Sequence, residues 1–173
     1  MTDTIPAPRV IVGVDDSDSS RWALSWALGE ARLRGLEVLL VHVAPVPPYA
    51  AAAGVPGHGA VCGLRDAGGE LITRMLAELR DSGGCDAVHV SGMTLLGAPG
   101  DALVRLAREE DILVVGRSGR GLLSRLLRPS VHRHCAAHAR ATLICVSPPS
   151  IEPLTIPGAA GERHARRWLR RRG

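Results

Sequence analysis

The chain has 173 residues, 46% of them hydrophobic, and a formal net charge of +4. This length and apolar content are typical of one globular domain with a buried core, and they exclude a disordered chain. Every one of the 21 Lys+Arg residues is Arg, which excludes P-loop and pyridoxal-phosphate enzymes because both classes need a lysine.

The positive charge is concentrated at the C-terminus. Residues 161–173 hold six Arg and one Glu, a net charge of +5, whereas the other 160 residues hold 15 Arg and 16 acids, a net charge of −1. We therefore expect residues 149–173 to form a basic, flexible tail after a near-neutral domain at 9–148, with residues 1–8 as an N-terminal tail. We expect no nucleic-acid binding except through the basic tail, where Trp168 and Leu169 favour a short basic helix as the alternative.

We expect the chain to be cytoplasmic, because its sequence carries no recognisable membrane span or secretory signal. The apolar runs are far shorter than the ~20 residues that span a membrane. The N-terminus lacks the basic and apolar regions of a secretory signal. The cysteines form no C-x-x-C pair, and we expect them to be reduced thiols packed in the interior: Cys62, Cys85, Cys135 and Cys145.

The first predicted elements are a buried strand over 9–14 and a helix over 19–34. A polar turn at 15–18 separates them, Asp18 or Ser19 is the expected cap of the helix, and Gly35 is its expected end. One stripe of this helix is apolar and lies beside a row of alanines, which favours close packing of both on a sheet. The stripe holds Trp22, Trp26, Gly29 and Leu33, and the row holds Ala23, Ala27 and Ala31.

The middle of the chain continues the alternation of strands and helices. A second buried strand is predicted over 38–43, followed by a Pro/Gly-rich loop at 44–63. A helix is then predicted over 66–80 and a third strand within 87–95. The remaining elements are a short helix over 99–108, a strand over 112–115, a helix over 130–139 and a strand over 142–146.

This order predicts an α/β fold, an open five-stranded parallel sheet with helices on both faces. Strand runs that are apolar throughout indicate that both sheet faces are covered. Ligands of such sheets bind at the carboxyl ends of the strands. The segments expected at that edge are 15–18, 43–48, 97–100 and 116–130.

The segment after the fourth strand favours an anion site. Gly116 and Gly119 let the backbone approach a phosphate, and the helix that begins near Pro129 offers unpaired amides. Arg117 adds a cation. The spacing is not G-x-G-x-x-G, so we do not predict a dinucleotide site, and a plain glycine turn stays the alternative.

Here the chain resembles the universal stress protein family. Gly116-x-x-Gly119, nine further residues, a small residue and Ser130 resemble the family's G-x-x-G-(nine)-G-[S/T] signature. Other segments agree in order and spacing, so that the resemblance covers roughly residues 8–147. They are Val12-Gly13-Val14-Asp15, Val41-His42-Val43, Gly97-x-Pro99 with Ala102-Leu103, and His138-Ala139 before Thr142.

The resemblance implies a flavodoxin-like sheet with strand order 3-2-1-4-5, often dimerised through the last strand, and ATP bound in a subset of members. Asp15 matches the residue that contacts the adenosine part, and Val43 matches the backbone that flanks adenine. Gly116, Gly119 and Ser130 match the phosphate cradle. The other expected nucleotide-binding residues adjoin these positions: Val14, Val115, Ser118 and Val131.

Two departures from the family pattern leave the function open. Pro129 replaces the third signature glycine and removes one amide, although the amides of Ser130 and Val131 remain. Asp16 and Asp18 add charge that repels a triphosphate unless Mg²⁺ lies between. We expect a dimeric stress-response protein that binds ATP, with at most weak hydrolysis; the alternative is a dimeric interaction module that binds no nucleotide.

Two other chemistries fit the sequence less well. Asp16-Ser17-Asp18 superficially resembles the nucleophile segment of haloacid-dehalogenase phosphatases, but those enzymes need a lysine and this chain has none. His134 and His138 have the i, i+4 spacing of zinc ligands. No further ligand is evident, so we interpret both as part of a solvated helix face.

Overall fold

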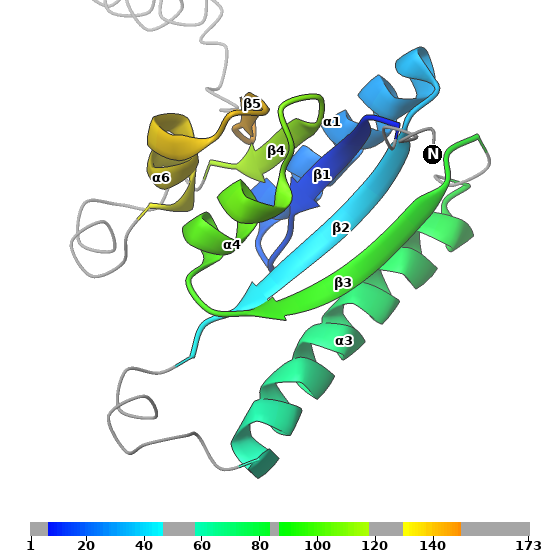
Figure 1. The fold of residues 1–173 in the computed structure, drawn as a ribbon. Helices are drawn as coiled ribbons and strands as arrows, with labels where there is room; N and C mark the ends of the chain where they lie inside the picture. Colours follow the sequence, from blue (N-terminus) through cyan, green and yellow to red (C-terminus); the bar gives the residue numbers. More distant parts are fainter. Residues whose placement is uncertain (1–6, 47–57, 84–86, 118–129, 150–173) are drawn as a thin grey trace, which may run out of the picture.

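A computed structural model describes residues 7–46, 58–83, 87–117 and 130–149 (Figure 1). Its five strands form one parallel sheet in the order β3-β2-β1-β4-β5, which confirms the predicted topology. The strands are β1 (Arg9–Gly13), β2 (Glu37–Ala44), β3 (Val90–Leu96), β4 (Ile112–Gly116) and β5 (Thr142–Val146).

Helices cover both faces of this sheet, as the continuous apolar runs predict. On one face α1 (Asp18–Arg34) and α3 (His58–Asp81) pack against alternate strand residues such as Val10 and Val12. On the other face α4 (Pro99–Leu106) and α6 (Val131–His138) pack against the intervening residues such as Ile11. No helix in the described ranges is long and apolar enough to cross a membrane.

The helix α1 begins one residue earlier than predicted and has a different cap. Ser17, not Asp18 or Ser19, is the N-cap, and its hydroxyl accepts a hydrogen bond from the amide of Ser20. Gly35 ends the helix in the left-handed conformation with φ of 64°, as predicted.

The prediction that the tryptophans of α1 pack on the sheet is wrong. The helix buries its alanine row together with Leu24 and Leu28, whereas Trp22, Trp26 and Leu33 are exposed. Small side chains let the helix lie close to the sheet, and the bulkier neighbouring stripe is turned outward as a result.

The predicted loop at 44–63 is too long at both ends. The strand β2 includes Ala44, and α3 begins at His58 despite Gly59 and Gly63. Glycine costs a helix only about 1 kcal/mol per residue, which the packing of a 24-residue helix offsets. Residues 47–57 lie outside the described ranges.

Burial of the cysteines is confirmed at one position only. Cys135, on α6, is buried, and burial raises the pKa of its thiol to about 11. Cys62 and Cys145 are exposed, so the expectation is wrong for these two, and Cys85 lies outside the described residues.

A buried carboxylate, that of Asp111, links β1 to the turn before β4 at the amino end of the sheet. Asp111, 1% exposed, accepts hydrogen bonds from the backbone amides of Arg9 (3.2 Å) and Arg108 (3.0 Å) and from the guanidinium of Arg108 (2.9 Å). Burial favours the neutral acid, but the hydrogen bonds from Arg108 and Arg9 outweigh it and lower the pKa of Asp111. The start of β1 is thereby joined to the turn before β4.

Replacing this carboxylate is expected to destabilise the fold. Asp111→Asn leaves two arginines without their charged partner and should lower the free energy of unfolding by about 3 kcal/mol. Because the folded pKa is depressed, the stabilisation is full above the unfolded pKa and is lost as the pH falls through the folded pKa. Urea unfolding at pH 7 and at about pH 3 should therefore show a variant deficit that shrinks in acid.

The matched control is Glu109→Gln, which removes an exposed acid from the same turn, paired with Arg140 at 3.5 Å. It should change the free energy of unfolding by less than about 0.5 kcal/mol. A deficit for Asp111→Asn that is the same at both pH values contradicts the assignment.

Candidate functional site

The turn after β1 is fixed to its neighbour β2. The amide of Val14 donates to the carbonyl of Val41 at 2.9 Å, and the carbonyl of Val14 accepts from Nδ1 of His42 at 3.0 Å. His42 was not among the predicted site residues. Its place opposite Val14 follows from strand register and not from any local motif.

Asp15 stands exposed at the tip of this turn with a defined orientation. Its amide donates to the hydroxyl of Ser20 at 3.0 Å. Its Oδ1 accepts from the amide of Ser17 at 3.1 Å and from the Ser17 hydroxyl. No other described residue bonds to this carboxylate, so a pre-oriented acceptor faces solvent at the carboxyl edge.

The next residue, Asp16, is neutralised by arginines. Its Oδ1 lies 3.0 Å from Nη2 of Arg74 on α3 and 3.6 Å from Nη2 of Arg21 on α1. The repulsion of a triphosphate that we expected from this side chain is therefore offset at its source. The arginine at position 74 lies 58 residues along the chain, too far for sequence reasoning to pair them.

Gly116, at the end of β4, lies against the first turn of α1. A Cβ on this residue would come within 2.6 Å of the backbone carbonyl of Ser19. The glycine is therefore required by packing, whatever else it does. The amide of Arg117 then donates to the carbonyl of Val146 at 2.6 Å. The end of β4 is thus held beside the turn that carries Asp15.

The helix α6 lies near the carboxyl edge of the sheet. Ser130 is the N-cap but makes no side-chain cap; its hydroxyl pairs instead with Nδ1 of His132 at 2.6 Å. His134 packs its ring on Gly100 and places Nε2 2.8 Å from Asp101, in the first turn of α4. Because α4 begins just after β3 ends, this contact holds α6 near the carboxyl ends of the strands.

The two helix histidines therefore have a packing role. His138 stacks on His134 with ring centroids 4.4 Å apart. The interpretation of a purely solvated helix face is wrong for His134, whose ring joins α6 to α4. The partner, Asp101, gave no signal in the sequence.

Most of the predicted nucleotide-binding residues lie at one edge of the sheet. Val14, Val43 and Val115 are buried at the ends of three adjacent strands. Asp15 and Gly116 follow two of these strands, and Ser130 and Val131 begin α6. Ser118 and Gly119 lie outside the described residues.

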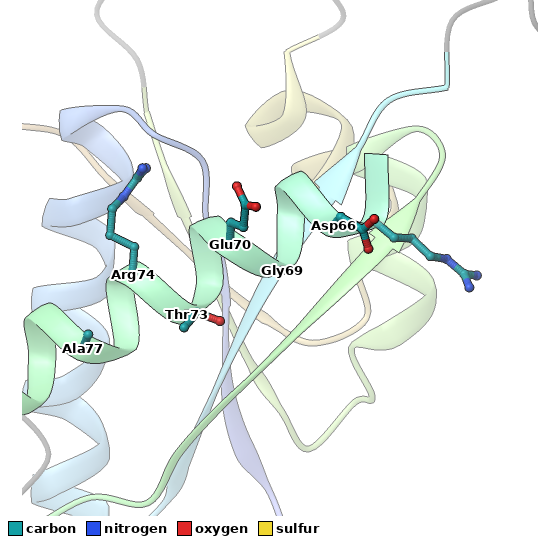
Figure 2. Close-up of a pocket in the computed structure, with 7 residues that line it drawn as sticks. Asp66, Gly69, Glu70, Thr73, Arg74 and Ala77 are labelled. Atoms are coloured by element: carbon teal, nitrogen blue, oxygen red, sulfur yellow. The ribbon is translucent and has the colours of Figure 1, made fainter. Parts of the chain in front are cut away.

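A shallow hollow lies along α3 (Figure 2). It is lined from one helix only and contains both acidic and basic side chains. None of the predicted nucleotide-binding residues borders it, so we do not place the site there. Its lining residues are Arg65, Asp66, Gly69, Glu70, Thr73, Arg74 and Ala77 of α3.

Comparison with known families and curated proteins gives a consistent result. The model of the universal stress protein family matches residues 7–147. Universal stress protein Rv2623 of Mycobacterium tuberculosis is 30% identical over 141 residues, which are 79% of this chain and 46% of that protein. Universal stress protein MJ0531 of Methanocaldococcus jannaschii is 25% identical over 149 residues, 83% and 84% of the two chains. The chain spans less than half the length of the first mycobacterial relatives, 42% for Rv2005c.

Solved structures show the same fold. UspA from Lactobacillus plantarum superposes with a TM-score of 0.61 at 17% identity, covering 80% of this chain and 97% of that chain. A universal stress protein from Archaeoglobus fulgidus gives 0.59 at 25% identity, covering 80% and 98%. A universal stress protein in complex with cAMP gives 0.58 at 30% identity, covering 80% and 96%.

The packing of Gly116 gives a prediction that needs no ligand. Gly116→Ala forces β4 and α1 apart and should lower the free energy of unfolding by about 2 kcal/mol. Gly69→Ala on α3 is the control, since a Cβ there meets nothing within 4 Å and alanine favours the helix by about 0.5–1 kcal/mol. Thermal unfolding of the two variants without nucleotide measures the difference, and equal melting temperatures would count against the close approach.

Proposed function

Because this chain belongs to the universal stress protein family, we propose that it binds an adenine nucleotide, ATP, at the carboxyl edge of the sheet. One observation carries the proposal: the exposed, pre-oriented carboxylate of Asp15 stands beside the glycine at the end of β4. The cAMP complex of the 30%-identical family member adds support for this class of ligand.

In this proposal each part of the nucleotide contacts a different group of the described residues. The Asp15 carboxylate accepts hydrogen bonds from ribose hydroxyls, and the ends of β1 and β2 at Val14 and Val43 form the apolar side toward adenine. The phosphates lie at the backbone of Gly116 and at the first amides of α6, where the helix dipole favours an anion. Arg117, exposed at the end of β4, supplies a countercharge.

Magnesium would arrive bound to the triphosphate. Asp16 is engaged by Arg74 and Arg21, so it does not fit the role of a protein ligand for Mg²⁺. The proposal therefore gives Asp16 no part in holding the metal complex.

Binding should depend on one carboxylate and not on its neighbour. Asp15→Ala removes charge-assisted hydrogen bonds of about 1.5–3 kcal/mol and should weaken ATP binding about tenfold or more. Asp16→Ala, the matched control, should leave the dissociation constant within about threefold, since its charge is already balanced by arginines. Calorimetric titration with ATP, with and without Mg²⁺, measures both.

The same titration separates the alternatives. AMP and cAMP test whether the triphosphate is needed, and GTP tests the selection of adenine. If none of these nucleotides binds at millimolar concentration, the proposal fails and the interaction module without nucleotide is favoured. Equal effects of the Asp15 and Asp16 substitutions would remove the role assigned to Asp15.

We also propose that the protein acts as a dimeric stress-response regulator, joined through β5. This strand pairs with β4 on one side and is an edge of the described sheet, so its other side can accept a second strand. Hydrogen exchange at residues 142–146 should slow as the protein concentration rises. Exchange that is independent of concentration would contradict pairing through this strand.

A further inference from the structure

One helix face carries the large apolar side chains that the described structure leaves exposed. They are Trp22 (47% exposed), Trp26 (37%) and Leu33 (85%), all on α1. With Gly29 they form a single stripe, which we call the α1 stripe. Three exposed apolar side chains lie on one helix face, and exposed apolar surface of this kind on soluble proteins commonly marks an interaction site.

The α1 stripe faces away from the rest of the described molecule. The flank of α1 next to the stripe faces α3, where Arg21 pairs with Glu78 and Arg32 donates to the carbonyl of Gly83 at 3.3 Å. The buried face of α1 meets the sheet (Figure 1). The α1 stripe therefore has no partner among the described residues.

The spacing of the α1 stripe is self-complementary. Positions 22, 26, 29 and 33 follow steps of four, three and four, which read the same in both directions along the helix. Two copies of α1, antiparallel about a twofold axis between residues 27 and 28, place Trp26 opposite Gly29 and Trp22 opposite Leu33. The space over Gly29 is open to 4 Å, so an indole of the second helix has a notch to enter.

The exposed area matches what such a pair needs. Exposure of this degree leaves about 350 Å² of apolar side-chain surface per copy, or about 700 Å² for two. A minimal specific interface buries about 1,200 Å² in total, of which about 57% is apolar, or about 680 Å². Two α1 stripes thus supply the apolar centre of a small interface, and the polar residues flanking them supply its rim.

We propose that the α1 stripe is a self-association surface that docks on the α1 stripe of a second copy of this chain. The contact is antiparallel and twofold symmetric. It lies on the face of α1 turned away from the sheet, and it does not depend on nucleotide binding or on pairing through β5.

The test uses the full chain carrying Trp168→Phe, so that Trp22 and Trp26 are its only two tryptophans. As concentration rises, sedimentation velocity should show a doubling of mass, tryptophan emission should shift to shorter wavelength, and acrylamide quenching should fall severalfold. Leu33→Arg should abolish the emission and quenching changes and the part of the mass increase that the α1 stripe contributes, leaving at most the dimer joined through β5. Ala77→Arg, which adds the same charge to an exposed residue of α3, should abolish none.

Two results would overturn the proposal. One is a mass and an emission spectrum that Leu33→Arg leaves unchanged at every concentration. The other is tryptophan shielding that is independent of concentration and disappears when residues 150–173 are removed, which would make the chain's own tail the occupant. ATP affinity of Leu33→Arg should equal that of the parent chain, so failure here is distinct from failure of the nucleotide site.

Discussion

The close approach of Gly116 to the backbone of Ser19 sets the geometry of the whole carboxyl edge. It brings the end of β4 against the first turn of α1, within one turn of the carboxylate of Asp15. A side chain at this position would separate the two elements and widen the gap between them. The glycine is therefore a packing requirement first, and in the proposed site the same lack of a side chain would let a phosphate approach the backbone.

The acidic side chains at the two ends of the sheet differ in burial and in their partners. At the amino end Asp111 is buried and bonded by Arg108 and Arg9, and it holds the strands together. At the carboxyl end Asp15 is exposed and pairs with no arginine of the described residues, while its neighbour Asp16 is paired with two of them. Of the two adjacent carboxylates in this turn, one is engaged in ion pairs and the other is the one that the proposed function assigns to the ligand.

The sequence predicted the sheet well because most strands are short runs dominated by apolar, β-branched residues that alternate along the chain with longer helical patterns; β3, with Ser91, Gly92 and Thr94, carries the weakest signal of the five. It predicted the helix faces less well. The alanine row and the tryptophan stripe of α1 are both apolar, and only packing distance decides which one meets the sheet. The site was predictable as far as its residues follow strands directly, as Asp15 and Gly116 do. The partners of Asp16 and His134 come from other elements, at Arg74 and Asp101, and tertiary contacts of this kind leave no local pattern.

The three serines at the start of α1 each make a different contact. Ser17 caps the helix and orients the carboxylate of Asp15, Ser19 offers its backbone to β4, and Ser20 receives the amide of Asp15. Helix initiation and ligand geometry therefore share the same few atoms. A substitution that loosens the start of the helix would therefore also change the orientation of the neighbouring carboxylate.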